Sequence, residues 1–149
     1  MKIPFGTISI TEKSKDLISQ ILDSGRVSIG RYVREFEERF AALLWVKEAV
    51  AVSSGADADT LALAVLQEFG AKRGDEIILP ALSFPATGHA VLHAGFKPVF
   101  ADIEKETLNI NPRKIEEKIT KNTKAILPVH LMGKPAEMDT IQGIAKRHN

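Results

Sequence analysis

The chain has 149 residues, of which 44% are apolar and 26% charged, and its formal net charge at pH 7 is +1. This length predicts one ordinary domain, and the composition is that of a soluble globular protein. A near-neutral charge without a Lys/Arg cluster argues against nucleic-acid binding. No apolar run reaches the roughly 18 residues of a transmembrane helix, and the absence of cysteine fits a reducing compartment. We therefore expect a cytoplasmic protein that binds neither nucleic acid nor membrane.

Two amphipathic helices are predicted in the first third of the chain. Residues 14–22 are apolar at helical spacing and end at the turn 23–25. Residues 31–44 place apolar side chains, including Phe36 and Phe40, on one face and charged side chains on the other.

The remainder of the chain alternates between short apolar segments and helical patterns. The apolar segments lie at residues 49–52, 76–79, 98–101 and 125–129. The predicted helices lie at residues 55–69, 86–94, 112–119 and 136–147. Strands that alternate with helices are typical of parallel βαβ crossovers. The sequence therefore predicts an α/β fold, with a mainly parallel sheet covered by helices on both faces.

The stretch SSGADADTLAL, residues 53–63, is a small-residue turn that opens a predicted helix. Backbone N–H groups at Gly55, together with the helix dipole, would attract an anion. The alternative is an ordinary N-cap formed by Ser53 or Ser54, with Asp57 as a first-turn acid. On local pattern alone the N-cap is favoured, because caps are common, and no glycine-rich nucleotide fingerprint is present.

Four other side chains could take part in chemistry. Phe84 follows a predicted strand, where its ring would lie against a flat ligand or pack in the core. His130 follows another strand and is either a functional or a hydrogen-bonded structural residue. His89 and His93 have the spacing of two metal ligands, but the HExxH glutamate and a third ligand are lacking, so we expect no metal site.

Six ordered blocks resemble the N-terminal half of the DegT-type sugar aminotransferases, which are fold-type-I pyridoxal 5'-phosphate (PLP) enzymes. The blocks are residues 30–37, 53–63, 74–80, 83–87, 97–103 and 128–139. The resemblance implies part of the PLP-transferase large domain. It also implies transfer of an amino group from an amino-acid donor to a nucleotide-linked keto sugar.

The resemblance also implies roles for individual residues. Gly55, Ala56 and Asp57 match the cup that binds the cofactor phosphate, and this match reverses the preference for a plain cap. Phe84 matches the aromatic residue that stacks on the pyridine ring. Two positions depart from the family: Ala56 replaces a usual threonine, at a cost of about 1 kcal/mol if its hydrogen bond is not replaced, and Asp59 replaces a usual leucine.

In the family, the aspartate that pairs with the pyridinium nitrogen and the lysine that bonds to the cofactor lie beyond the position of Asn149. The resemblance implies that residues 1–149 are the N-terminal part of the large domain, without its C-terminal half, and are inactive alone. We assign no catalytic residue within them. Because family members are usually homodimers, a homodimer or a complementing chain is expected.

In the family's sheet, strands of the second half separate the first strand from the other three. The segment 49–53 would then have no sheet neighbour within this chain. Two alternatives to an aminotransferase half stay open. One is a non-catalytic module of the same fold that acts through another chain, and the other is an unrelated nucleotide-binding α/β domain, which the missing glycine fingerprint disfavours.

Overall fold

The computed structural model describes residue 6 and residues 8–148, and the contacts of the chain separate into two units, Met1–Ala51 and Val52–Asn149. No linker in the sequence predicts this division. None of the described helices combines the length and apolarity needed to cross a membrane.

The first unit contains the helices α1, Glu12–Asp23, and α2, Arg31–Leu44. The Thr11 side chain caps α1 by accepting from the Ser14 amide at 3.2 Å. The bounds of α2 agree with those predicted, and Trp45 ends the helix in the left-handed region with φ of 55°. The unit buries little: among its described residues only Ala41 is fully buried. The apolar faces of both helices therefore stay largely exposed.

The second unit is built on a three-stranded parallel sheet in the order β2-β1-β3. The strands are β1, Glu76–Pro80, β2, Lys97–Ala101, and β3, Thr123–Ile126. The central strand β1 is buried along its whole length, as expected for a strand with neighbours on both sides. In register, Ile77 lies opposite Pro98 of β2 and Ala125 of β3.

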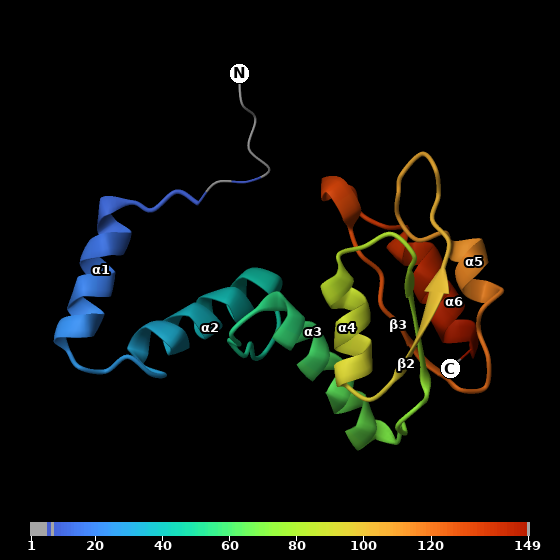
Figure 1. Ribbon diagram of the computed structural model, residues 1–149, viewed down its shortest axis with the longest axis horizontal. Helices are drawn as coiled ribbons and strands as arrows, with labels where there is room; N and C mark the ends of the chain where they lie inside the picture. The colour runs from blue at the N-terminus through green and yellow to red at the C-terminus, as the bar shows by residue number, and fades with distance from the viewer. Residues whose placement is uncertain (1–5, 7, 149) are drawn as a thin grey trace. The chain divides into compact units, whose positions relative to one another are not determined.

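Helices cover both faces of this sheet, as predicted (Figure 1). On one face, α3, Gly55–Ala64, and α4, Pro85–His93, pack with Ile77 and Leu79. On the other face, α5, Pro112–Glu116, and α6, Met138–His148, pack with Ile78. The period-2 alternation of one strand thus divides the core into two clusters. Short 3₁₀ helices, η1 at Val65–Phe69 and η2 at Leu131–Gly133, complete the unit.

The prediction of a strand at residues 49–52 is wrong. These residues form no strand, and the Ala51 amide donates instead to Oε1 of Glu37 at 2.8 Å. A strand requires a neighbour to satisfy its backbone, and no described segment pairs with this one. The fourth predicted strand is also shorter at its end: β3 stops at Ile126, and only the Leu127 amide continues the ladder, to the Ile78 carbonyl at 2.7 Å.

Candidate anion-binding site

The start of α3 is an N-cap built by Ser54. Its backbone is extended, with φ of −156° and ψ of 164°, and its hydroxyl accepts a 3.1 Å hydrogen bond from the Asp57 amide. The Ala58 amide donates to the Ser54 carbonyl at 3.0 Å. The amides of Gly55 and Ala56 have no hydrogen-bond acceptor within residues 8–148. The N-cap predicted from the sequence is confirmed. The amides of Gly55 and Ala56 remain as two open donors at the positive end of the helix dipole.

The Asp57 carboxylate lies beside these donors and is held by two hydroxyls. Oδ2 accepts from the Ser54 hydroxyl at 2.9 Å and also from the Ser53 hydroxyl. These hydrogen bonds, first that of Ser53 and then that of Ser54, keep the pKa of Asp57 below its usual range. Asp57 is therefore ionised at neutral pH. It opposes an anion electrostatically while it ties the turn together.

The space at the cup is open on the side of Gly55. A Cβ built on Gly55 would meet no other atom within 4 Å, and the residue is exposed. Both serine hydroxyls are already turned to Asp57, so an anion would be held by the two amides and the helix dipole. The open space and the two amide donors of the turn fit a phosphate group, whereas the negative charge of Asp57 weakens the attraction of the turn for an anion.

Phe84 lies directly before α4, at the end of the turn that follows β1. Its side chain is 77% exposed, so the alternative that it packs in the core is wrong. A 2.6 Å hydrogen bond between the Ser83 and Thr87 hydroxyls and a 3.0 Å bond from the Thr87 amide to the Phe84 carbonyl hold the turn. The ring is thus presented on a fixed backbone, with its surface available to a flat ligand.

The predicted site residues fall into two groups. Gly55, Ala56 and Asp57 form one continuous turn, whereas Phe84 lies at the start of the neighbouring helix. The helices α3 and α4 pack against each other, but no hydrogen bond joins the two groups in the part of the chain that the structure describes. Asp59, the other departure from the expected pattern, is half-buried on α3.

A model of the DegT/DnrJ/EryC1/StrS aminotransferase family matches residues 8–149, which include the cup and Phe84. The chain belongs to this family. The chain is 40% identical over 146 residues to the spore coat polysaccharide biosynthesis protein SpsC of Bacillus subtilis. It is also 40% identical over 148 residues to the GDP-perosamine synthase of Escherichia coli O157:H7. These alignments cover 98% and 99% of this chain but 37% and 40% of the two relatives.

A solved structure of a related enzyme matches this chain in its three-dimensional fold as well. The E. coli GDP-4-keto-6-deoxy-D-mannose-3-dehydratase with bound hydrated PLP superposes with a TM-score of 0.87 at 36% identity, over 97% of this chain and 38% of the dehydratase. The expectations of the family, of a fold-type-I α/β architecture and of PLP as the family's cofactor are confirmed. The chain spans about two fifths of the length of these aminotransferase-family relatives.

Three histidines were singled out in the sequence. Nδ1 of His130 accepts a 3.0 Å hydrogen bond from the Ala136 amide, as expected for a hydrogen-bonded structural residue. The rings of His89 and His93 stack with centroids 6.2 Å apart. No group of three or more potential metal ligands occurs among residues 8–148.

Sequence patterns did not predict the importance of Asn109. This buried side chain donates from Nδ2 to the carbonyls of Lys134, at 3.0 Å, and Pro135, at 3.1 Å, and accepts from the Leu131 amide at 2.9 Å. It therefore joins the loop after β2 to the loop after β3. An asparagine in a loop is common, so only the long-range contacts reveal this role.

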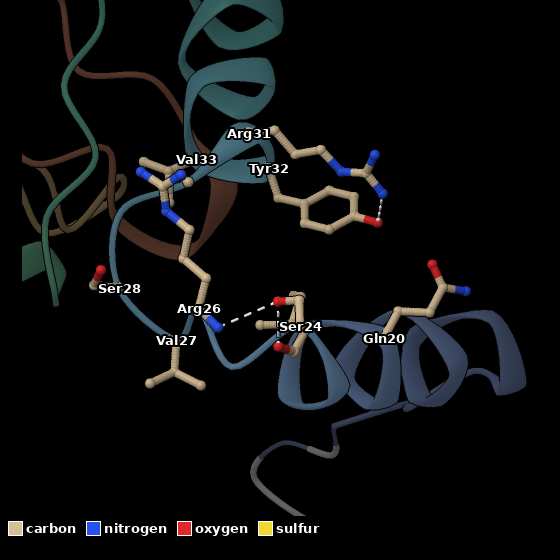
Figure 2. A pocket seen from close by; sticks show the side chains of 10 residues that line it. Gln20, Ser24, Arg26, Val27, Ser28, Arg31, Tyr32 and Val33 are labelled. Atoms are coloured by element: carbon tan, nitrogen blue, oxygen red, sulfur yellow. Dashed lines mark hydrogen bonds between the residues drawn. The ribbon is translucent and has the colours of Figure 1, made fainter.

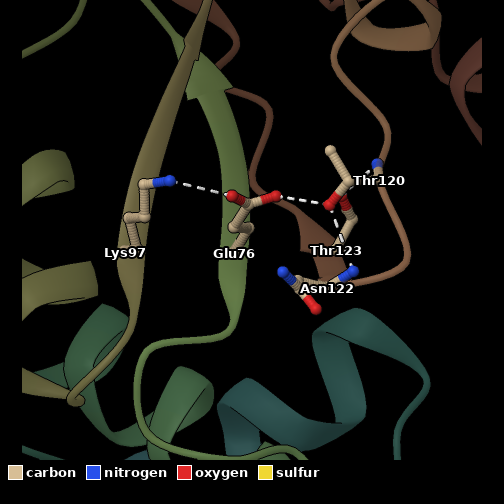
Figure 3. Close-up of polar contacts among 5 residues, drawn as sticks. All are labelled: Glu76, Lys97, Thr120, Asn122 and Thr123. Carbon is tan, nitrogen blue, oxygen red and sulfur yellow. Dashed lines mark hydrogen bonds and ion pairs between the residues drawn. The ribbon is translucent and has the colours of Figure 1, made fainter.

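Glu76, the first residue of the central strand, is a second buried polar residue that the sequence did not single out. Its two carboxylate oxygens accept from Lys97 Nζ at 2.9 Å and from the Thr120 hydroxyl at 2.6 Å (Figure 3). The Thr120 hydrogen bond, followed by that of Lys97, lowers the pKa of Glu76. The three strands are thus joined at their amino ends by one ionised group.

Proposed function

We propose that this chain is the N-terminal, phosphate-binding part of the large domain of a PLP-dependent sugar aminotransferase. The observation that supports this proposal best is the pair of open amides at Gly55 and Ala56. The resemblance implies that these residues belong to the family's cofactor cup. The ordered match of residues 8–149 to the family supports the same assignment.

In this proposal the cup would hold the cofactor phosphate and Phe84 would lie against its ring. The amides of Gly55 and Ala56 would donate to phosphate oxygens, and the dipole of α3 favours a negative charge there. Asp57 fixes the turn through Ser53 and Ser54 rather than contacting the anion favourably. When bound, PLP supplies the electron sink that amino transfer requires.

The proposed substrates are a nucleotide-linked keto sugar and an amino-acid donor. The names of the relatives motivate this assignment: three are GDP-perosamine synthases, and one is a dTDP-3-amino-3,6-dideoxy-alpha-D-galactopyranose transaminase. Because the structural match also includes a dehydratase with bound PLP, cofactor binding is better supported than the particular reaction.

The resemblance places the cofactor-bonding lysine and the pyridinium-pairing aspartate outside residues 1–149. We expect these residues alone to show no aminotransferase activity, and we expect activity to require that further segment, in a homodimer or a complementing chain in the cytoplasm. The alternative is a non-catalytic module of the same fold. The two proposals predict different results when a complementing C-terminal half is added. The aminotransferase proposal predicts amino transfer from glutamate to a keto sugar, and the non-catalytic alternative predicts none.

Binding of PLP by the chain tests the proposal directly. Equilibrium dialysis and ³¹P NMR compare PLP with pyridoxal, which has the same ring but lacks the phosphate. We expect PLP to bind at least about tenfold more tightly, because only PLP reaches the two amides with charge-assisted hydrogen bonds. Equal affinities for the two compounds would contradict the cup assignment.

A matched pair of glycine variants locates the site. Gly55→Val fills the space where the phosphate would lie, whereas Gly6→Val adds the same side chain at another position with nothing within 4 Å. We expect Gly55→Val to abolish the preference for PLP over pyridoxal and Gly6→Val to retain it. Retention of the preference by both variants would place any PLP binding elsewhere.

A further inference from the structure

A second candidate site lies in the first unit, where the connection between α1 and α2 surrounds a cavity of about 640 Å³ (Figure 2). No acidic side chain among the described residues lines it. The residues that bear on its chemistry are Gln20, Ser24, Arg26, Arg31, Tyr32 and Val33. Arg26 comes from the connection and Arg31 from the first position of α2, and both line this cavity.

The Arg31 side chain is held in place by its neighbour Tyr32. Nη2 of Arg31 donates to the Tyr32 hydroxyl at 2.7 Å, and its Cζ lies 4.6 Å from the centroid of the ring. The cation–π contact covers one face of the guanidinium, and the hydrogen bond to the hydroxyl uses one of its N–H donors. The remaining N–H groups are free to bind an acceptor, because Arg31 takes part in no ion pair within residues 8–148.

Arg26 supplies the second guanidinium from the loop. Its backbone amide donates to the Ser24 hydroxyl at 3.2 Å, which fixes the turn after α1. Figure 2 shows the Arg26 side chain extending from this loop toward the first turn of α2, beside Val33. Its guanidinium also has no carboxylate partner in the described chain.

The segment between α1 and the first turn of α2 carries three positive charges. Residues 24–34 contain three arginines and no aspartate or glutamate, and Asp23 and Glu35 flank them. Glu35 and Glu38 line an adjoining hollow with Arg26, Arg31 and Arg34, but Glu35 is paired with Arg39. One carboxylate is thus left to offset three guanidinium groups.

We propose that this cavity binds the phosphate or diphosphate group of a small organic ligand. Arg26 and Arg31 would each offer N–H pairs that match phosphate oxygens. Gly30, which caps α2 without a side chain, leaves the first amides of that helix open beside them. The apolar side chains of Ile21, Val27 and Val33 provide a wall for the organic part of the ligand. The site shares no residue with the cup on α3, so it does not depend on the proposed function.

Titration of the full chain with inorganic diphosphate tests this site. In ¹H–¹⁵N NMR spectra we expect saturable shifts of the Arg31 and Tyr32 amides and of the Arg26 and Arg31 side-chain Nε–H signals. Shifts that do not saturate, or that are confined to the start of α3, would overturn the proposal. The second pattern would still be compatible with the cofactor cup, so the two proposals can fail separately.

Charge-matched variants separate a built site from general attraction. Arg26→Gln and Arg31→Gln should each weaken diphosphate binding about tenfold. Lys13→Gln removes the same charge from exposed α1 and should leave affinity unchanged. Arg31→Lys, which retains the charge but loses the planar fork, should also bind more weakly than the wild type. Equal effects of Lys13→Gln and Arg26→Gln would reject a specific site in favour of nonspecific charge attraction.

Discussion

The Thr120 hydroxyl donates a 2.6 Å hydrogen bond to Oε2 of Glu76, although the two residues are 44 positions apart in the sequence. Lys97 of β2 occupies the other carboxylate oxygen at 2.9 Å. The amino ends of all three strands are therefore connected through one carboxylate. Because both partners favour the ionised form, the contribution of this group to stability depends on pH.

Thr120→Val should lower the Tm at pH 7 by about 3 °C, because it removes a hydrogen bond to an ionised group.

The size of this effect should depend on pH, because the pKa of Glu76 is lowered in the folded state. The ionised Glu76 stabilises the fold above about pH 4.3, where the carboxyl of the unfolded chain titrates. This stabilisation is lost as the pH falls through the folded pKa. Thermal melts between pH 3 and pH 7 measure this. We expect Thr120→Val to differ from the wild type less at pH 3. The control is Thr140→Val at an exposed position of α6. A Tm difference independent of pH would contradict the ionic role.

Asn109→Ala should lower the free energy of unfolding by about 2–3 kcal/mol, because it removes three part-buried hydrogen bonds between a buried side chain and the backbone. Urea unfolding of the chain measures the loss. Asn122→Ala is the matched control, since the Asn122 side chain is exposed and forms no hydrogen bond within the described residues. Equal stability of the two variants would show that Asn109 does not hold the loops together.

Leu79→Ala should lower the free energy of unfolding by about 2–5 kcal/mol, because Leu79 is 1% exposed and its truncation leaves a cavity between β1 and the helices α3 and α4. Leu92→Ala on α4 removes the same atoms from a side chain that is 55% exposed, and should change stability by about 0.5 kcal/mol or less. Chemical denaturation of both variants gives the comparison. Similar losses would mean that the burial of the central strand does not dominate stability.

Ala56→Thr should raise the affinity for PLP about fivefold if the added hydroxyl contributes roughly 1 kcal/mol to phosphate binding. The position is the second residue of α3, next to the open amides. Ala62→Thr adds the same group at an exposed position on the same helix and should have no effect. Equilibrium dialysis with PLP distinguishes them, and an unchanged affinity for Ala56→Thr would place the phosphate away from this residue.

The sequence predicts those elements whose stability is local. The bounds of α2 follow from its amphipathic pattern, with Gly30 before it and Trp45 after it. The N-cap at Ser54 follows from residue preference at helix starts. Both features depend on neighbours within a few positions.

Features that depend on distant partners were not predictable from local sequence patterns, and only the resemblance implied that the segment 49–53 has no sheet neighbour. Residues 49–52 have a strand-like composition, but no strand lies beside them, and the Ala51 amide bonds to a side chain instead. The roles of Asn109 and Glu76 depend on loops and strands more than 20 positions away. The left-handed backbone of Leu108, next to Asn109, has φ of 60° and no glycine to signal it. The conformation or role of each of these residues depends on tertiary contacts.

The position of β1 at the centre of the sheet has a consequence for synthesis of the protein. Both of its neighbours, β2 and β3, come later in the chain. The most apolar strand therefore leaves the ribosome first and waits for on the order of 50 further residues before its second partner exists, a delay of about 2–10 s at ordinary elongation rates. During that interval Ile77, Ile78 and Leu79 are open to chaperones, so β3 controls when the nascent chain can close its core.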